Sequence, residues 1–349
     1  MKKILTTLCA VAMLAGCTAG GSKKSSTNTA STKEETAATV MVGTGSVTNV
    51  SNKTKEGSDT TAQFDTTFAS VVLEGNVIKY VYFDVAQDKV TYDATGHVTS
   101  DNTASTSKKA LGDKYGMKDK SSIKKEWYEQ VEALEKWAVG KTVEEVLNMP
   151  TTQKDEKHTV SADKDLMTGC TIGVTAFQQA LDKAAKNAVE VKDVASVGSA
   201  ILTQVSGKDA SAEKSGEAKA SSTYGVVALD KDGKAVFTQT DVAQNAVKFT
   251  TAGVVDGEAV AVATKGEKKD EYGMKKVSSI GKEWFEQNQA YDDWTVGKTS
   301  KEIAGMEVTT NEGGKTVTAD KDLMTGCTIG VDSLQKVTTT AIEAATKLN

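Results

Sequence analysis

The sequence predicts an α+β fold of two tandem repeated domains, each a small antiparallel sheet with about three helices. Three observations lead to this prediction. The chain of 349 residues is long enough for two modest domains. It matches itself without a gap at an offset of 157 residues, as Trp127 and Trp284 illustrate. Within each copy, segments rich in β-branched and aromatic residues precede segments with helical spacing, an order typical of α+β folds.

The repeat sets the predicted domain boundaries. Residues 159–174 and 316–331 differ only at Ser161 and Thr318. A period of this length is too long for a solenoid repeat, so we expect each copy to be a domain with its own core. The predicted boundaries are 63–190 for the first domain, 191–219 for a polar linker and 220–349 for the second domain.

The N-terminus has the features of an export signal. Lys2 and Lys3 precede an apolar run that ends at Leu14 and is too short to cross a bilayer as a helix. The run continues into Leu-Ala-Gly-Cys, which resembles the lipobox of bacterial lipoproteins. The resemblance implies that residues 1–16 are a signal peptide and that Cys17 is acylated, with palmitate among the acyl chains. An ordinary signal peptide with a coincidental Cys17 is the alternative.

The segment that begins at Cys17 predicts a tether. Residues 17–62 are dominated by Ser, Thr, Gly, Lys and Ala and show no sustained apolar period. This composition is typical of a disordered stalk. With an acylated Cys17, it predicts a protein anchored at the outer face of the cytoplasmic membrane of a bacterium, of the Gram-positive type.

Strands are expected first in each copy. Residues 68–83 and 88–99 are rich in Val, Ile, Tyr and Phe. They are interrupted at Gly75 and Gly96, as antiparallel strands joined by turns would be.

Three helices are expected next. The first follows the N-cap residue Ser122, because apolar residues recur at helical spacing from Ile123 onward. Thr142 and Glu145 form a capping box that opens a short second helix. The third helix begins at Thr175. The second copy repeats these signals.

Composition excludes several classes of function. The chain has 42 Lys+Arg against 47 Asp+Glu and 5% aromatic residues, and every basic residue is a lysine. Nucleic-acid binding needs a positive stripe with stacking aromatic residues, so that class is excluded. His97 and His158 are isolated and no Cys-x-x-Cys pair occurs, so we expect no zinc, haem or iron–sulfur site. Redox chemistry would need an organic cofactor.

The stretch in which the two copies are most similar is a Gly/Thr-rich turn before the third helix. It reads Asp-Leu-Met-Thr-Gly-Cys-Thr at residues 165–171 and again at 322–328. Both windows resemble the covalent flavinylation motif Asp-x-x-(Ser/Thr)-Gly-x-(Thr/Ser). Proteins with this motif receive FMN from a secreted, magnesium-dependent flavin transferase that uses FAD as donor. The resemblance implies a phosphoester between FMN and the last hydroxyl, that of Thr171 or Thr328.

The spacing within the motif suits this chemistry. A glycine lets the backbone turn tightly and approach a phosphate, and the N-terminus of the following helix offers N–H donors. The resemblance assigns the cofactor site to two covalent acceptors, Thr171 and Thr328, with Asp165, Thr168, Gly169, Asp322, Thr325 and Gly326 beside them.

Each residue of the motif also has a simpler interpretation. Asp165 and Asp322 are expected to serve recognition by the transferase, and the alternative is that they only cap a turn. Cys170 and Cys327 stand where the family has a small or apolar residue, and we expect free, buried thiols there. Of the repeated aromatic residues, Trp127 lies on the apolar helix face and is expected in the core. At most one aromatic residue per domain is expected to contact flavin.

The lipobox, the polar stalk and two motif-bearing domains together resemble the flavin-bearing extracellular electron-transfer lipoproteins of Gram-positive bacteria, also called pheromone lipoproteins. The resemblance implies an electron carrier with two covalent FMN groups. It would pass electrons from a membrane quinol or its dehydrogenase to extracellular acceptors such as ferric iron or soluble flavins. It would not be an enzyme but the substrate of a flavin transferase.

Two other interpretations stay open. A flavin-dependent reductase of a small organic acceptor would need an acid/base constellation, and no such group recurs in both copies. A non-redox surface lipoprotein, such as an adhesin or a solute-binding module, would use the repeated motif only as a turn.

Overall fold

The structure is a computed structural model that describes residues 39–101 and 104–348. The predicted signal peptide 1–16, the acylation site Cys17 and the first part of the predicted stalk lie outside the described residues. Ala37–Asn349 form one compact unit. We call residues 39–192 the first half and residues 193–348 the second half.

Apart from β4, which occurs only in the first half, the strands of the described residues follow the same order in both halves. They are β1 (Val40–Thr54), β2 (Thr60–Glu74), β3 (Val77–Tyr92), β4 (Ala104–Ser105), β5 (Thr151–Asp155), β6 (His158–Ser161) and β7 (Val189–Val191), then β8 (Ser196–Lys208), β9 (Gly216–Leu229), β10 (Ala235–Phe249), β11 (Val308–Thr310), β12 (Thr316–Thr318) and β13 (Thr346–Lys347).

The helices also recur in order. They are α1 (Lys108–Leu111), α2 (Trp127–Ala138), α3 (Val143–Leu147), α4 (Lys164–Met167) and α5 (Thr175–Lys186), then α6 (Lys265–Lys268), α7 (Trp284–Thr295), α8 (Ser300–Ala304), α9 (Lys321–Met324) and α10 (Asp332–Glu343), with 3₁₀ helices at Gly112–Tyr115 and Lys269–Tyr272.

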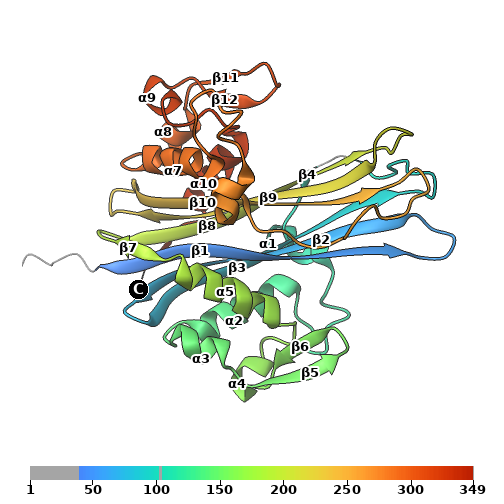
Figure 1. Cartoon of the computed structure of the whole chain (residues 1–349). Helices are drawn as coiled ribbons and strands as arrows, with labels where there is room; N and C mark the ends of the chain where they lie inside the picture. The colour runs from blue at the N-terminus through green and yellow to red at the C-terminus, as the bar shows by residue number, and fades with distance from the viewer. Residues whose placement is uncertain (1–38, 102–103, 349) are drawn as a thin grey trace, which may run out of the picture. The chain divides into compact units, whose positions relative to one another are not determined.

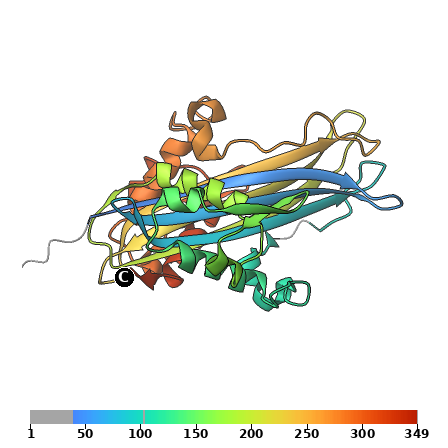
Figure 2. The same cartoon turned by 90° about the horizontal axis from the view of Figure 1, so that it is seen from below.

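Two antiparallel sheets form the centre of the fold, which confirms the α+β prediction. The first has the strand order β3-β2-β1-β7, and the second has the order β10-β9-β8-β13 with β4 of the first half also paired to β8. Helices α2 to α5 lie on one side of the paired sheets and α7 to α10 on the other (Figures 1 and 2). No helix of the described residues is both long enough and apolar enough to span a bilayer.

The faces of the two sheets that meet carry small hydroxyl side chains together with apolar ones. Ser70 of β2 bonds to Ser199 of β8 through their hydroxyls, and Tyr80 donates to the Ser199 hydroxyl at 3.1 Å. Thr203 donates to the buried carboxyl of Asp88. These pairs satisfy polar groups that burial would otherwise leave without a partner. Segments rich in Ser and Thr can therefore form buried strands in this fold.

Equivalent residues of the two halves meet across this interface. Tyr92 and Phe249, which differ by the repeat offset, stack with ring centroids 3.8 Å apart and planes 5° from parallel. A Cβ at Gly96 would lie 2.5 Å from the Thr250 carbonyl oxygen, and a Cβ at the equivalent Gly253 would lie 2.6 Å from that of Asp93. Reciprocal contacts of this kind are typical of a two-fold symmetric interface.

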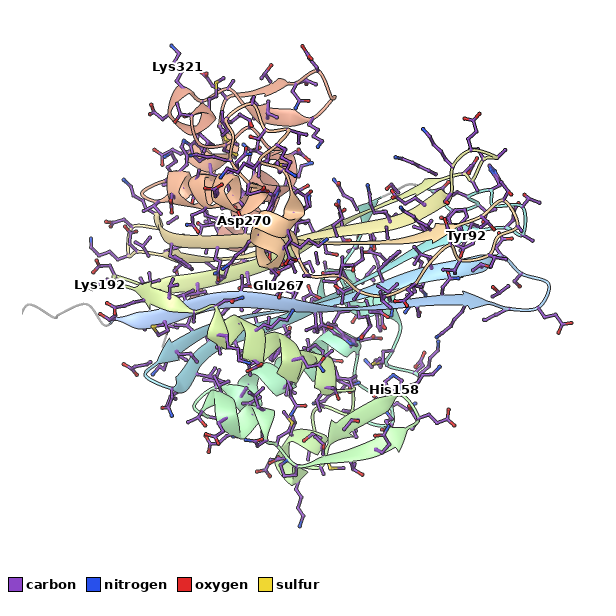
Figure 3. All side chains as sticks on the ribbon, viewed as in Figure 1. Tyr92, His158, Lys192, Glu267, Asp270 and Lys321 are labelled. Atoms are coloured by element: carbon purple, nitrogen blue, oxygen red, sulfur yellow. The ribbon has the colours of Figure 1, made fainter. Side chains whose placement is uncertain are left out.

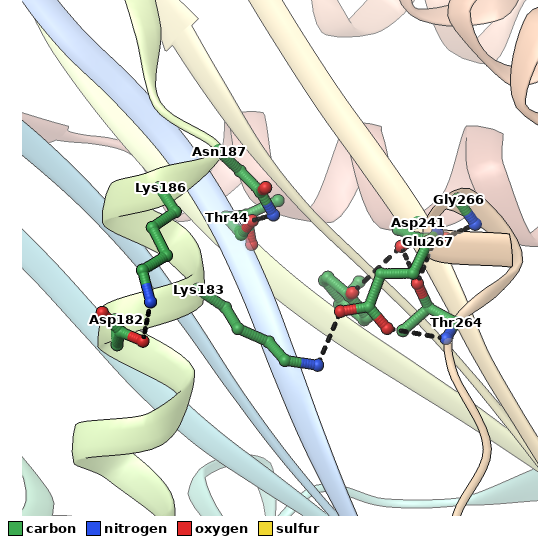
Figure 4. Close-up of polar contacts among 10 residues, drawn as sticks. Thr44, Asp182, Lys183, Lys186, Asn187, Asp241, Thr264, Gly266 and Glu267 are labelled. Carbon is green, nitrogen blue, oxygen red and sulfur yellow. Dashed lines mark hydrogen bonds and ion pairs between the residues drawn. The ribbon is translucent and has the colours of Figure 1, made fainter. Parts of the chain in front are cut away.

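Polar side chains also join the halves at the edge of the sheets. Lys183 on α5 donates to Glu267 on α6 at 2.6 Å, and Figure 4 shows this ion pair spanning the gap between the two helices. Thr44 of β1 accepts a bond from Asn187 through its carbonyl oxygen, and its N–H donates to Gln239 of β10 at 2.8 Å.

The structure differs from the predicted domain boundaries at two places. Strand β1 and the start of β2 lie inside the predicted stalk 17–62, and β8 lies inside the predicted linker 191–219. Their small residues allow close packing on both faces: Gly43 and Gly198 lie against helices α5 and α10, and Ser199 faces the partner sheet. Each half has apolar core clusters of its own, as expected, but further clusters combine residues of both halves, as Val42 and Val226 do.

The predicted helices all occur, with one corrected start. Helix α2 begins at Trp127 rather than after Ser122, and its cap is Glu126, whose carboxylate forms a capping box with Glu129. The capping box of Thr142 and Glu145 before α3 is confirmed. The third predicted helix, α5, begins at Thr175 as expected.

Candidate functional site

The repeated motif forms a short helix and the turn that follows it. Asp163 caps α4, and its carboxylate accepts bonds from the N–H groups of Asp165 at 3.1 Å and Leu166 at 2.9 Å. Thr168 ends the helix, and its hydroxyl donates to the Asp165 carbonyl oxygen at 2.8 Å. The second half makes the same contacts through Asp320, Asp322, Leu323 and Thr325.

The charged residues of the motif face solvent. Lys164 and Asp165 on α4 are exposed, and so are Lys321 and Asp322 on α9. Figure 3 shows Lys321 projecting away from the body of the second half. The cap of each helix is the preceding aspartate, so Asp165 and Asp322 are not needed for capping. Their proposed role in recognition by a transferase stays a prediction.

The motif glycine allows close packing on a helix. A Cβ at Gly169 would lie 2.7 Å from the Cβ of Ala133 on α2, and one at Gly326 would lie 2.8 Å from that of Ala290 on α7. The nearest neighbour of each glycine is thus a helix side chain. Approach to a phosphate, the reason given by the sequence, is not needed to explain this residue.

The cysteines of the motif are free and buried, as predicted. Cys170 and Cys327 are 1% and 0% exposed. Burial raises the pKa of each thiol to about 11. Both thiols therefore stay protonated near neutral pH and are poor nucleophiles.

The last threonine of the motif is held by a buried glutamine. The side-chain oxygen of Gln130 on α2 accepts a bond from the Thr171 N–H at 3.0 Å and a second from the Thr171 hydroxyl at 3.2 Å. Gln287 on α7 makes the same two contacts with Thr328, at 2.8 and 3.0 Å. Both glutamines are 0% exposed.

The amide nitrogen of this glutamine is fixed as well. Gln130 Nε2 donates to the Ser121 hydroxyl and to the Lys125 carbonyl oxygen, both at 3.1 Å. Its neighbour one turn earlier, Glu126, accepts bonds from the N–H groups of Met117 at 2.8 Å and Lys118 at 3.0 Å. The second half repeats these contacts through Gln287, Ser278, Lys282, Glu283, Met274 and Lys275.

Thr171 lies in the wall of a cavity of about 800 Å³. Cavities of roughly 300 to 1,000 Å³ are typical of sites for small molecules and cofactors. The wall includes the aromatic or apolar side chains of Tyr115, Met117, Trp127, Phe177 and Ile172, and also the polar side chains of Asn49, Asp65, Lys108, Lys154 and Asp155.

Aromatic rings and a lysine share one wall of this cavity. The ring centroids of Tyr115 and Trp127 are 6.3 Å apart, and the Lys108 ammonium lies 5.2 Å and 5.5 Å from them. Trp127 is also a core residue, as predicted, and is 3% exposed. The wall combines a flat apolar surface with a cation, which suits a planar, anionic ligand.

The strand pair β5-β6 supplies another part of the cavity wall. Lys154 donates to the Thr171 carbonyl oxygen at 3.1 Å, which places its ammonium beside the motif. His158 (labelled in Figure 3) contacts the Asp155 carboxylate at 2.7 Å through Nδ1. In the second half, Asn311 and Lys315 occupy the positions of Lys154 and His158.

The second half keeps the aromatic wall but changes its charges. Lys265 lies 5.5 Å from the ring centroids of both Tyr272 and Trp284, as Lys108 does in the first half. Burial, reinforced by repulsion from Lys315 and Lys219, lowers the pKa of Lys265 to about 8. Its charge is therefore sensitive to mildly alkaline pH.

Buried carboxyl groups differ between the halves behind these walls. Glu135 on α2 pairs with Lys109 at 2.7 Å, and burial raises the pKa of Glu135 to about 7. The equivalent position in α7 is Asp292, which accepts bonds from the Thr240 hydroxyl at 2.7 Å and from the Thr240 N–H at 3.0 Å. Burial raises the pKa of Asp292 well above its ordinary value.

The motif predicts Thr171 and Thr328 as flavin acceptors but does not indicate the glutamines that bond to them. The structure brings Thr171 together with Gln130, which lies 41 positions earlier in the chain. A signal was present, because a glutamine stands between Trp127 and Val131 on the apolar face of the helix and recurs at Gln287. A polar residue at a core position of both copies calls for a buried partner.

Comparison with protein-family models finds no match to this chain. Comparisons with curated proteins and with solved structures find no match either.

Proposed function

We propose that the chain is an exported, membrane-anchored electron carrier with FMN linked covalently to Thr171 and Thr328. In this proposal the two halves are repeated FMN-binding units, and a flavin transferase that uses FAD and Mg²⁺ modifies both. Electrons would enter from a membrane quinol or its dehydrogenase and leave to extracellular acceptors such as ferric iron or soluble flavins. The chain itself is the substrate of the transferase and not an enzyme.

The observation that carries this proposal is that Thr171, whose hydroxyl is the last group of the motif, lines the cavity. The motif predicts a phosphoester at that oxygen, and the adjoining space is large enough for a cofactor. Tyr115, Met117 and Trp127 offer an apolar surface to a planar ring. Lys154 and Lys108 offer positive charge to a phosphate or to an anionic ring, in a chain that has no arginine.

The recurrence of the site in the second half supports the same proposal. Thr328 has the same two bonds to a buried glutamine, and the same lysine, tyrosine and tryptophan stand beside one another. Buried packing alone does not require the exposed residues of the motif to be identical in both halves. A single modifying enzyme that must recognise both sites would require it.

FMN supplies the redox chemistry when it is bound, and the protein holds it in place. Covalent attachment suits a carrier outside the cell, because dissociated FMN would diffuse away. The buried thiols of Cys170 and Cys327 are protonated and take no part.

The test is electron transfer to a ferric chelate. The full chain is co-expressed with a flavin transferase, reduced without oxygen, freed of reductant and mixed with ferric citrate. We expect rapid ferric reduction by the unaltered chain and none by the Thr171→Ala/Thr328→Ala double variant. Equal reduction by the two proteins, or a chain that acquires no flavin, contradicts the proposal and favours a non-redox binding module.

A further inference from the structure

We propose that Gln130 and Gln287 are positioning residues that orient the hydroxyls of Thr171 and Thr328 for transfer of the flavin phosphate. The inference rests on the proposed function, because it concerns the same two threonines.

The hydrogen bonds of Gln130 fix which way its amide faces. A backbone N–H can only donate, so the group that meets the Thr171 N–H must be the amide oxygen. A backbone carbonyl can only accept, so the group that meets the Lys125 carbonyl must be the amide nitrogen. The two contacts lie at opposite ends of one amide, and a flipped amide would break both. The orientation therefore follows from the contacts themselves.

A fixed amide oxygen in turn fixes the threonine hydroxyl. The Gln130 oxygen accepts the hydroxyl hydrogen of Thr171 at an O···O distance of 3.2 Å. The lone pairs of the Thr171 oxygen then point away from Gln130, which is fully buried, while Thr171 itself lines the cavity. The N–H bond to the same amide oxygen holds the backbone of the threonine at the same time.

This arrangement matches what phosphoryl transfer needs from an acceptor. In the proposed step a bond forms between the threonine oxygen and the FMN phosphorus of FAD, and the bond from that phosphorus to the bridging pyrophosphate oxygen breaks. AMP leaves with the bridging oxygen, and the hydroxyl proton passes to a base of the transferase. No atom is oxidised or reduced. A neutral amide does not take up the proton, so Gln130 positions the nucleophile and does not act as a base.

The same glutamine links the acceptor to the aromatic wall. Its nitrogen donates to Ser121, in the loop that Glu126 holds at Met117. Met117 and Tyr115 line the cavity from this loop. Gln130 thus sets the distance between the acceptor hydroxyl and the surface that would receive the flavin ring.

The experiment measures modification at one threonine at a time. Unmodified full chain with Thr328→Ala is treated with purified flavin transferase, FAD and Mg²⁺, and the rate of FMN addition is followed at increasing chain concentration. Gln130→Met removes the acceptor and both donors at similar volume. We expect its kcat to fall roughly 10- to 100-fold with little change in KM, because a misplaced nucleophile slows the chemical step.

A matched control separates positioning from general loss of packing. Gln178 on α5 also donates two bonds from a partly buried amide, to the carbonyl oxygens of Val146 at 3.1 Å and Leu147 at 2.9 Å, but it does not bond to Thr171. Gln178→Met is expected to keep the rate of the parent chain. Gln130→Glu keeps an acceptor oxygen toward Thr171 and is expected to recover most of the rate lost in Gln130→Met.

The outcomes distinguish this inference from the proposed function. A parent chain that acquires no FMN overturns the proposed function, whatever the variants do. A parent that is modified, with Gln130→Met as fast as the parent, overturns the positioning role alone. So does a folded Gln130→Glu chain that is modified roughly 10- to 100-fold more slowly than the parent, and this comparison with the parent decides the question if Gln130→Met fails to fold. The same series at Gln287, with Thr171→Ala in the background, is expected to give the same order of rates.

Discussion

At the scale of single residues, the two halves use different chemistry at one equivalent buried position. The first half places Glu135 there and neutralises it with Lys109 at 2.7 Å. The second half places Asp292 there, and the position of Lys109 is taken by Gly266. Asp292 is instead surrounded by the hydroxyl and N–H of Thr240 and by the amide of Asn288. A buried carboxyl without a cation favours its neutral form.

Asp292 therefore makes stability depend on pH in a defined direction. Its pKa in the folded chain lies well above the value of about 3.8 expected in the unfolded chain. The folded state binds a proton that the unfolded state releases, so the free energy of unfolding falls as pH rises above that value. Asp292→Asn removes this contribution. One such group changes the free energy of unfolding by at most about 1.4 kcal/mol per pH unit.

The measurement is urea unfolding of the unaltered chain and of Asp292→Asn at pH 5, 6.5 and 8. We expect the stability of Asp292→Asn relative to the unaltered chain to increase with pH. Asp232→Asn, at an exposed turn, is the control and is expected to stay within about 0.5 kcal/mol at every pH. A constant difference between Asp292→Asn and the unaltered chain would contradict the assignment.

The motif thiols give a second test at this scale. Burial raises the pKa of both Cys170 and Cys327 to about 11, and their side chains are almost fully covered. In a chain that begins at Thr18, we expect an aromatic disulfide reagent at pH 8 to react with neither thiol until the protein is unfolded. Fast reaction of either thiol in the folded protein would show that the motif turn opens.

At the scale of elements, close contact between a helix and a strand depends on single glycines. A Cβ at Gly198 of β8 would lie 1.7 Å from the Ala341 carbonyl oxygen of α10. In the first half the contact of α5 with β1 falls at Gly43, where a Cβ would lie 2.3 Å from the Ala184 carbonyl oxygen. The two contacts are equivalent, because Ala184 and Ala341 differ by the repeat offset of 157 and β1 aligns with β8 at an offset of 155 residues.

Gly198→Ala is expected to destabilise the fold by about 3 kcal/mol or more, because the backbone of α10 must move away from β8. Urea unfolding measures the loss. Gly313→Ala is the control, since it lies in the exposed β11-β12 turn with its nearest neighbour 3.4 Å away, and we expect a change within about 0.5 kcal/mol. Equal stability of the two variants would mean that α10 does not pack on β8 as described.

Elements with strong local signals could be predicted from the sequence, and β1 and β8 could not. The capping box at Thr142 and the apolar stripe of α2 depend only on neighbouring residues. The sequence of β1 is typical of a polar, exposed segment, because it includes Thr44 and Ser46. Both residues are buried in the structure. The polar groups of such a strand find partners only in the folded chain: the Thr44 hydroxyl donates to the Ala69 carbonyl oxygen at 2.8 Å, and the Thr44 N–H donates to Gln239 of the second sheet.

The same limit applies to the site. Thr171 and its motif could be predicted because they are contiguous in the sequence and occur twice. Gln130, Ser121 and the cavity wall come from other elements, and only tertiary packing brings them to the motif. The lysine beside the aromatic wall, Lys108, recurs as Lys265, but no motif in the neighbouring sequence marks it as part of the site.

At the scale of the whole molecule, the duplicated halves pack as the two subunits of a symmetric dimer would. Tyr92 meets its equivalent Phe249, and the turns at Gly96 and Gly253 approach each other reciprocally. The core clusters between the sheets belong to both halves. The halves are therefore expected to unfold together.

Tyr92→Ala tests this cooperativity. Loss of the buried, stacked ring is expected to cost about 3 to 5 kcal/mol. Two reporter chains keep tryptophan in only one half each, by Trp→Phe changes at Trp127 and Trp137 or at Trp284 and Trp294. Tyr92→Ala is expected to lower the thermal midpoint of both reporters equally. A shift confined to the first half would mean that the halves are independent domains.

The central claim is that this chain carries FMN on two threonines, and intact mass tests it most directly. The chain is co-expressed with a flavin transferase as the unaltered protein, as Thr171→Ala, as Thr328→Ala and as the double variant, with Thr175→Ala as the control from the same cavity wall. We expect two additions of about 440 Da in the unaltered chain and in the control, one in each single variant and none in the double variant. No addition in the unaltered chain, or an addition that persists in the double variant, would contradict the account.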